Sequence, residues 1–221
     1  MIRSPLQRRT TETEVTLNQR IQNYLAEHTA VIAALSAELD TMNAMIQLCT
    51  RRLREGSKIM ICGNGGSAAD AQHIAAELIG RFVGDRRALP AVALTTDSSA
   101  LTAIANDYGY DAVFSRQVEG LGCAGDVLLS ISTSGNSASV NEACRVATAL
   151  GMHTLALTGK SGGVLKSLAD FALVVPSEVT AHIQECHIVV GHLLCDGIEQ
   201  GLELAKHDDL VEKSKSGFSR P

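Results

Sequence analysis

Two stretches of the chain contain side chains that could bind a metal ion or move a proton. His73 and Glu77 are four residues apart, so they share one face of a helix expected after residue 65. An imidazole and a carboxylate at this spacing can ligate a metal or act as an acid–base pair, and a helix face that only meets solvent has the same pattern. Five polar residues crowd a later stretch of eleven positions: His182, Gln184, Glu185, His187 and His192. Their spacing does not say which of them face a site, and Glu185 shares a helix face with His192 better than Gln184 does.

A cluster of hydroxyl side chains predicts an anion site. Ser132-Thr133-Ser134-Gly135-Asn136-Ser137 follows an apolar run and precedes a helix predicted over residues 138–150. Hydroxyls and the free N–H groups of a helix start can hold a phosphate monoester without a metal or a basic residue. An ordinary serine cap at the start of a helix is the alternative. Four hydroxyls within six residues, at the end of a buried strand, favour the anion site.

A glycine-rich segment offers a second place where a ligand could approach the backbone. Gly63-Asn64-Gly65-Gly66 precedes a predicted helix and matches the loose dinucleotide pattern GxGxxA. That pattern needs an acidic residue about 20 positions later, at the end of the second strand. Asp85 precedes this strand and Asp97 follows it too late, so we reject a nicotinamide site. A phosphate loop ending in Gly159-Lys160-Ser161 would need glycine at position 154, which is threonine.

The elements that must position these residues are predicted from five short apolar runs separated by helical stretches. The runs are KIMIC at 58–62, AVAL at 91–94, DVLLSIS at 126–132, MHTLAL at 152–157 and FALVVP at 171–176. Such runs are typical of parallel strands buried on both faces, and they predict an α/β fold, a three-layer αβα sandwich with a five-stranded parallel sheet. A last long helix is expected from about Thr180 to Ala205. Because ligands bind beyond the carboxyl ends of parallel strands, the loops after the runs should form the site.

A heptad pattern precedes the sheet. Apolar residues from Ile21 to Leu53 recur in alternating steps of four and three, and His28 is the only plainly polar member of this seam. We expect a long helical segment, as one helix or a kinked pair, that packs partly on another subunit. Two shorter core helices with a break near His28 are the alternative.

Composition excludes several classes of protein. The chain has 221 residues and a formal net charge of −5, which argues against nucleic acid or an anionic membrane as the main partner. It has no Trp, four Phe and three Tyr, too few for binding by aromatic stacking. No stretch approaches the roughly 18 apolar residues of a membrane-spanning helix.

Cysteine usage and length predict a cytoplasmic protein with one domain. Six cysteines form no CxxC pair, and several lie in apolar runs, which indicates a reducing compartment. At roughly 100–200 residues per domain, we expect a single domain over residues 17–205. Residues 1–16 should be a mobile leader without a secretory apolar stretch, and residues 206–221 a mobile tail.

Six segments in order resemble the sedoheptulose 7-phosphate isomerases, also called phosphoheptose isomerases, of the sugar-isomerase (SIS) superfamily. They are GNGGSAADAQHIAAE (63–77), LTTDSSALTAIANDYGY (94–110), FSRQVEGLG (114–122), STSGNS (132–137), LTGKSGG (157–163) and IQECHIVVGH (183–192). The serine segment is shared by many phosphosugar binders, whereas the first and last segments together are far more specific. The likeness runs from about Ser57 to Glu199, and the expected leader and tail are longer than the family core needs.

The resemblance implies a flavodoxin-like SIS fold and the interconversion of sedoheptulose 7-phosphate and D-glycero-D-manno-heptose 7-phosphate, the first step of activated heptose biosynthesis. Glu77 and His192 match the family's proton-transfer residues. One zinc ion per subunit would be held by His73, Glu77, Gln184 and His192. The residues implied to contact the substrate are Asn64, Gly65, Gly66, Glu77, Asn106, Asp107, Ser132, Thr133, Ser134, Ser137 and Gln184. The family works as a homotetramer with sites between subunits.

A non-catalytic SIS module is the competing hypothesis. Such relatives bind phosphosugars for regulation or associate with a replication initiator as assembly factors. The presence of both Glu77 and His192 favours the enzyme. A regulator would also need a DNA-binding domain, which 16 leader residues cannot supply.

Overall fold

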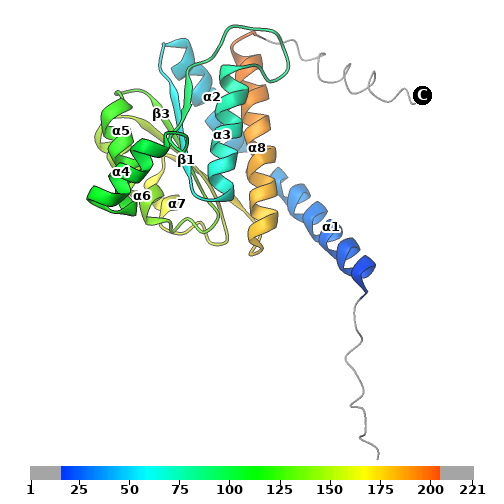
Figure 1. The fold of residues 1–221 in the computed structure, drawn as a ribbon. Coiled ribbons are helices and arrows are strands. Elements are labelled where there is room, and N and C mark those ends of the chain that lie inside the picture. The colour runs from blue at the N-terminus through cyan, green and yellow to red at the C-terminus, as the bar shows by residue number, and fades with distance from the viewer. Residues whose placement is uncertain (1–15, 205–221) are drawn as a thin grey trace, which may run out of the picture.

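The computed structural model describes residues 16–204, so the predicted mobile leader, apart from Thr16 at the N-cap of α1, and the predicted mobile tail fall outside the described residues. Five parallel strands form one sheet in the order β2-β1-β3-β4-β5 (Figure 1). Their bounds are β1 (Ile59–Gly63), β2 (Ala91–Ala93), β3 (Val127–Ser132), β4 (His153–Gly159) and β5 (Phe171–Val175). All five predicted runs are therefore strands.

Helices cover both faces of the sheet. The helices are α1 (Leu17–Ala34), α2 (Leu39–Arg54), α3 (Gly66–Ile79), α4 (Ser98–Tyr108), α5 (Ser115–Leu121), α6 (Ala138–Ala149), α7 (Leu165–Leu168) and α8 (Thr180–Gly201), with 3-10 turns η1 (Leu35–Glu38) and η2 (Tyr110–Ala112). The last helix ends at Gly201 rather than at the predicted Ala205. Within residues 16–204, no helix combines the length and the apolar character that a membrane crossing requires.

Alternating strand residues divide the core into two layers. Ile59 and Ile61 of β1 pack with α2, α3 and α8, whereas Met60 and Cys62 pack with α5, α6 and α7. Successive side chains of a strand point to opposite faces, so a strand covered on both sides must be apolar throughout. The predicted three-layer αβα sandwich is confirmed.

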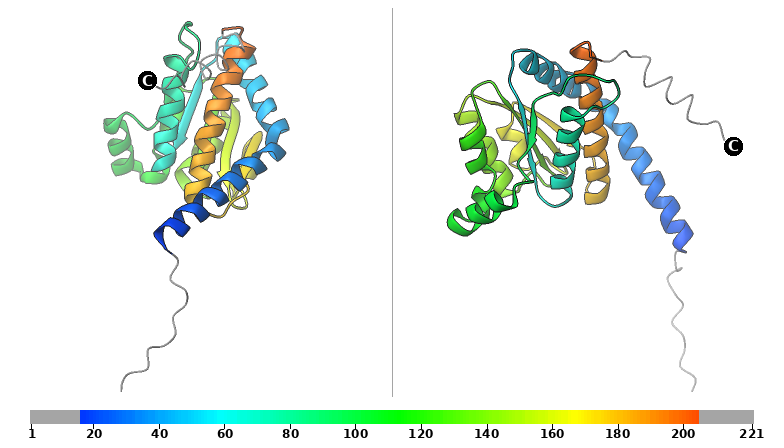
Figure 2. Two further views of the ribbon diagram at one scale, coloured as in Figure 1. Left: turned by 90° about the vertical axis from the view of Figure 1, so that its right-hand side faces the viewer. Right: turned by 45° about the horizontal axis from the view of Figure 1, so that its top comes forward.

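The heptad seam is divided between two helices of very different burial. It bends at η1, so the alternative break near His28 is wrong, because α1 continues through His28 to Ala34. Helix α2 buries six residues. None of the residues Leu17–Ala34, all of which the structure describes, is buried, and α1 projects from the body of the protein (Figure 2). The seam pattern therefore predicted the helices but not what covers the first one.

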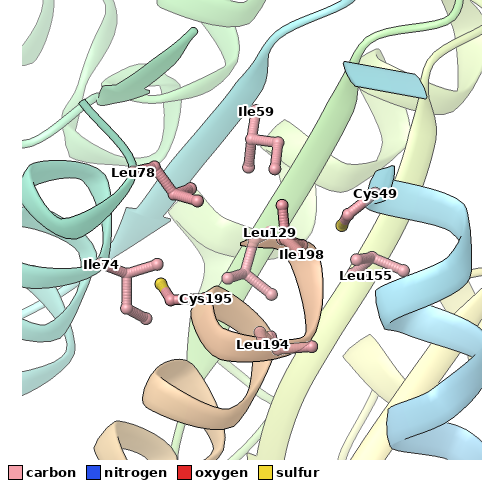
Figure 3. Close-up of a pocket in the computed structure, with 9 residues that line it drawn as sticks. All are labelled: Cys49, Ile59, Ile74, Leu78, Leu129, Leu155, Leu194, Cys195 and Ile198. Carbon is pink, nitrogen blue, oxygen red and sulfur yellow. The ribbon is translucent and has the colours of Figure 1, made fainter. Parts of the chain in front are cut away.

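A small apolar gap lies in the interior between α2, α3, α8 and the sheet. Nine side chains line it, among them Cys49, Leu129 and Cys195 (Figure 3). Its volume of about 10 Å³ is at the lower limit for one water molecule, and its lining is entirely apolar. This gap is a packing feature of the core and cannot hold a sugar.

Candidate active site

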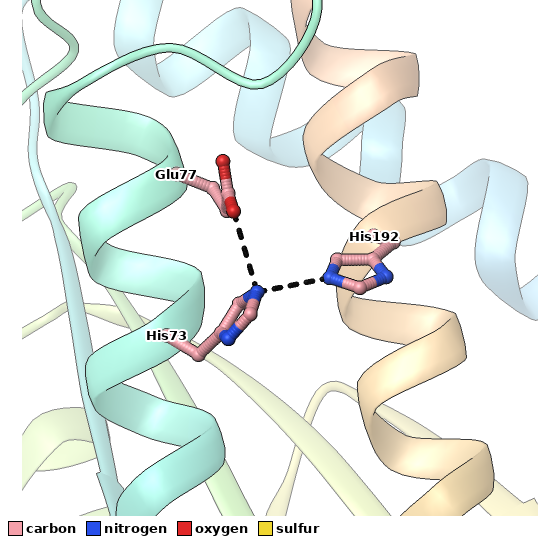
Figure 4. A group of neighbouring side chains, drawn as sticks. All are labelled: His73, Glu77 and His192. Atoms are coloured by element: carbon pink, nitrogen blue, oxygen red, sulfur yellow. Dashed lines mark hydrogen bonds and ion pairs between the residues drawn. The ribbon is translucent and has the colours of Figure 1, made fainter. Parts of the chain in front are cut away.

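Helices α3 and α8 lie side by side, and His73, Glu77 and His192 meet between them (Figure 4). We call these three residues the His–Glu–His group. His73 Nε2 is 3.0 Å from His192 Nε2 and 3.3 Å from Glu77 Oε1. Ligands about 2.1 Å from one tetrahedral ion are about 3.4 Å apart, and the two distances from His73 Nε2 are close to this value, while all three ligand atoms lie within 4.8 Å of one another. The His73–Glu77 pair thus has a third potential ligand, His192, on the neighbouring helix α8.

Close helix packing brings the two halves of this group together. A Cβ atom at Gly191 would lie 2.7 Å from Ile74 Cδ1, so a larger residue there would force Ile74 or the helices to move apart. Gly191 and Ile74 are the immediate neighbours of His192 and His73 in the sequence. Phe82 stacks on His192, with ring centroids 5.4 Å apart and an angle of 28° between the planes. Phe82 was not predicted from the sequence.

The other polar residues at the start of α8 have different partners. Glu185 Oε1 accepts a hydrogen bond of 2.6 Å from the Tyr24 hydroxyl, and Glu185 Oε2 is 2.9 Å from His28 Nδ1, both on α1. His182 packs against Tyr24, with ring centroids 4.5 Å apart. Although Glu185 shares a helix face with His192, its carboxylate binds Tyr24 and His28 of α1 and does not join the His–Glu–His group.

Gln184, the predicted fourth ligand, belongs to α8, and its side chain lies against the start of α3. A Cβ atom at Gly66 would collide with the side-chain amide of Gln184, so this amide lies directly over the first turn of the helix. His73 is two turns further along the same helix. The structure thus brings the Gln184 side chain to the glycine-rich segment, and within residues 16–204 it makes no hydrogen bond to the His–Glu–His group.

Residues 132–137, which we call the serine loop, begin at the last residue of β3 and lead into α6. Gly135 has a φ of +65°, and a Cβ atom there would collide with the carbonyl oxygen of Gly162, so the loop packs tightly against the loop after β4. Ser132 is buried, whereas Thr133, Ser134 and Ser137 are half-buried. Ser134 Oγ accepts a hydrogen bond of 3.1 Å from the backbone N–H of Asn136, a local turn contact.

Ser137 does not serve as an ordinary cap. Although it stands at the N-cap of α6, its side chain makes no capping hydrogen bond within the described residues. Its hydroxyl accepts a hydrogen bond of 2.8 Å from Asn64 Nδ2, which also donates to Ser139 at 3.0 Å. The N–H groups at the start of α6 therefore have no competing serine acceptor at this position, as an anion site requires.

Asn64 joins three segments that are far apart in the sequence. Besides donating to Ser137, its Oδ1 accepts a hydrogen bond of 2.8 Å from the Tyr110 hydroxyl in η2. The glycine-rich segment, the serine loop and the end of the α4 region thus meet beyond the carboxyl ends of β1 and β3. Sequence reasoning missed Tyr110, which has no pattern of its own. Asn106 and Asp107 lie exposed near the end of α4, where Asn106 Nδ2 donates to Asp107 Oδ1 at 2.8 Å.

Burial changes the acidity of two groups near these elements. Burial raises the pKa of Asp70 to about 6, although the charge of His73 acts in the opposite direction. Burial lowers the pKa of His187 to about 4, and a hydrogen bond between its Nε2 and the Thr158 carbonyl oxygen at 3.1 Å partly offsets this. His187 is therefore a neutral residue that attaches α8 to the end of β4, beside the serine loop.

Comparisons with known proteins point in one direction. A family model described as SIS domain matches residues 23–159. The chain is 53% identical over 184 residues to a phosphoheptose isomerase from Nitratiruptor sp., covering 82% of this chain and 98% of the relative. It is 48% identical over 184 residues to a phosphoheptose isomerase from Akkermansia muciniphila, covering 83% and 97%. Among solved structures, the phosphoheptose isomerase GmhA of Neisseria gonorrhoeae matches with a TM-score of 0.79 and 49% identity, over 84% of this chain and all of that chain.

Proposed function

Because the chain belongs to the SIS-domain family and, within it, to the phosphoheptose isomerases, we propose a residue-by-residue account of an aldose–ketose isomerase. The enzyme interconverts D-sedoheptulose 7-phosphate and D-glycero-D-manno-heptose 7-phosphate, a reaction of heptose biosynthesis. The observation that most strongly supports our account is the convergence of His73 and Glu77 with His192 across α3 and α8. The alternative of a non-catalytic sugar-phosphate-binding or assembly protein has no support among the relatives reported above.

The substrate phosphate binds in the serine loop. Ser132, Thr133, Ser134 and Ser137 donate hydrogen bonds to its oxygens, together with the N–H groups at the start of α6. Asn64 already contacts the hydroxyl of Ser137, which supports a continuous binding surface from the phosphate to the sugar. The sugar hydroxyls contact Asn64, Gly65, Gly66, Asn106, Asp107 and Gln184.

Proton transfer takes place at the His–Glu–His group. Isomerisation moves a proton between C1 and C2 through an enediol or enediolate, so one base must reach both carbons. The Glu77 carboxylate is this base and returns the proton to the neighbouring carbon. His192 donates and accepts protons at the O1 and O2 oxygens. The phosphate anchor fixes the sugar chain so that the reacting carbons stay within reach of Glu77.

The same residues suit a zinc ion. His73, Glu77 and His192 offer two imidazole nitrogens and a carboxylate within 4.8 Å of one another, and Gln184 is the proposed fourth ligand. This donor set is typical of zinc. When bound, zinc supplies a Lewis acid that stabilises negative charge on the substrate oxygens. One ion per subunit is our proposal.

We also propose that the protein is a homotetramer with sites between subunits. The exposed apolar residues of α1 support this, because Leu17, Ile21 and Leu25 have exposed fractions of 71%, 49% and 57% in the single chain. Sedimentation at micromolar concentration should show a tetramer, and a stable monomer would reject this proposal. Residues 17–205 then form one domain, and the six free cysteines, five of them buried, support a cytoplasmic location.

A coupled assay tests the proposed function. Purified protein receives sedoheptulose 7-phosphate, and formation of the aldoheptose phosphate is followed with and without a chelator. We expect turnover that falls when the metal is removed and returns with added zinc. Binding of the sugar phosphate without turnover in zinc-loaded protein would reject the enzyme and favour the binding-protein alternative.

A further inference from the structure

A buried ion pair lies beneath the segment that follows α3. Arg86 Nε donates to Glu199 Oε1 of α8 at 2.7 Å, and the two side chains are only 1% and 0% exposed. Glu199 also accepts hydrogen bonds from the backbone N–H groups of Phe82, Val83 and Gly84, at 2.9, 3.2 and 3.4 Å. One carboxylate of α8 thus holds the whole turn that leaves α3.

The Arg86 guanidinium also binds the end of α3. It donates to the carbonyl oxygens of Glu77 and Leu78, both at 2.8 Å, and to that of Gly80 at 3.2 Å. The last carbonyl groups of a helix have no partner within the helix, so Arg86 satisfies them and adds a positive charge at the negative end of the helix dipole. One of these carbonyls belongs to Glu77, the proposed base.

The carboxylate contacts the other side of the site through Phe82. The N–H group of Phe82 binds Glu199, and the ring of Phe82 stacks on His192. Arg86 therefore acts on Glu77, and Glu199 acts through Phe82 on His192. The same ion pair therefore contacts the backbone of Glu77 directly and the ring of His192 through Phe82.

Stability alone does not explain this arrangement. A buried ion pair loses the hydration of both charges, and a well-packed apolar pair often stabilises a protein as much or more. Burial by itself would raise the pKa of Glu199, yet the hydrogen bonds from Phe82, Val83, Arg86 and Gly84 lower it below its ordinary value, so the carboxylate stays ionised. Its directional bonds fix the geometry of the turn in a way that apolar contacts would not.

We propose that Arg86 and Glu199 are positioning residues that set the separation of Glu77 and His192 by holding the end of α3 against α8. This inference rests on the proposed function, because it assigns the pair a role in turnover and in zinc binding. A purely structural pair would affect folding stability alone. A positioning pair affects how well the His–Glu–His group forms while leaving the serine loop intact.

The test compares this pair with a matched control elsewhere in the fold. Asp126 is likewise buried, pairs with Lys58 and accepts hydrogen bonds from the backbone N–H groups of Lys58 and Cys123, at 2.9 and 2.8 Å. It precedes β3, at the end of the sheet opposite the serine loop. Asp126→Asn and Glu199→Gln make the same chemical change, and both are measured in the full-length protein beside Arg86→Lys.

Four quantities are measured for each variant: melting temperature, kcat, KM for sedoheptulose 7-phosphate, and the affinity of metal-stripped protein for Zn²⁺ by competition with a chromophoric chelator. Lost outer-shell partners cost about 10- to 100-fold in metal affinity or activity. We expect losses of that order in kcat and in Zn²⁺ affinity for Glu199→Gln and Arg86→Lys, with KM nearly unchanged. Asp126→Asn should lower the melting temperature without either loss.

Phe82→Leu keeps the ion pair and removes only the ring stacked on His192, so it carries the test if Glu199→Gln does not fold. It should shift kcat and Zn²⁺ affinity in the same direction by a smaller factor. Variants of Phe82 and Arg86 that match Asp126→Asn in both quantities would overturn the inference. A wild-type protein that neither isomerises the sugar phosphate nor binds Zn²⁺ would overturn the proposed function itself, and the inference with it.

Discussion

The serine loop and the His–Glu–His group lie beside the same sheet but are built in different ways. The serine loop consists of six consecutive residues, from the last residue of β3 to the N-cap of α6, so its hydroxyls belong to one short stretch of chain. The His–Glu–His group combines two helices, and its two histidines are 119 positions apart in the sequence. The first depends on local backbone geometry, whereas the second depends on how closely α3 packs on α8. We therefore expect substitutions in the loop to affect binding and substitutions in the group to affect turnover.

The largest expected effect is that of Glu77→Gln. This change removes the proposed base at almost constant volume, so kcat should fall by roughly 100- to 10,000-fold, the usual contribution of a general base. Sugar-phosphate binding should stay near normal, because the serine loop and Asn64 are unchanged. A loss of kcat without a loss of binding indicates a lost transition-state interaction. Steady-state kinetics and equilibrium binding test this, and full activity would reject Glu77 as the base.

His73→Ala tests the metal separately from the proton transfer. Loss of a direct ligand should weaken Zn²⁺ binding by more than the roughly 100-fold upper range of lost outer-shell partners. Glu77 and His192 remain in place, so turnover with saturating zinc should fall less than in Glu77→Gln. Metal content and kcat are measured for both variants in parallel. Unaltered zinc content would exclude His73 as a ligand.

Ser134→Ala and Ser137→Ala test the opposite side of the comparison. Each removes one hydrogen bond to a charged phosphate, worth about 1.5–3 kcal/mol, so the Kd for the sugar phosphate should rise roughly 10- to 150-fold. The kcat at saturation should change much less. Ser36→Ala, on the exposed turn η1, is the control. Unchanged affinity in both loop variants would mean that the loop only starts a helix.

The smallest expected effect is that of His187, whose hydrogen bond to the Thr158 carbonyl oxygen joins α8 to the end of β4 beside the serine loop. Its pKa of about 4 in the folded protein lies below the ordinary 6.5 of an unfolded chain, so the unfolded state binds a proton first as the pH falls. Above pH 6.5 the titration of His187 does not change the free energy of unfolding. Between pH 6.5 and 4 it lowers this free energy progressively, by at most about 3 kcal/mol. His187→Gln should flatten this dependence in urea denaturation measured at pH 7 and pH 5. An equal loss of stability between pH 7 and pH 5 in His187→Gln and in the unsubstituted protein would reject this role of His187.

Local sequence patterns predicted the five strands of the sheet and, within the candidate site, the serine loop. Five apolar runs predicted five parallel strands, because a strand buried on both faces must be apolar along its length. The hydroxyl cluster at 132–137 was recognisable for a similar reason, since its members are neighbours in the chain. The resemblance to the isomerases supplied the pairing of His73 and Glu77 with His192, which spacing alone left open.

Only the tertiary structure decided which side chains meet across elements. Glu185 shares a helix face with His192 better than Gln184 does. Its carboxylate nevertheless binds Tyr24 and His28, because α1 passes the start of α8. The heptad seam continues through α1, but in the single chain only α2 is buried. Gly191, Arg86 and Glu199 have no pattern of their own, and their roles follow from the close contact of α3 with α8. Periodicity reports which face of an element is apolar, whereas the partner of that face depends on packing between residues distant in the chain.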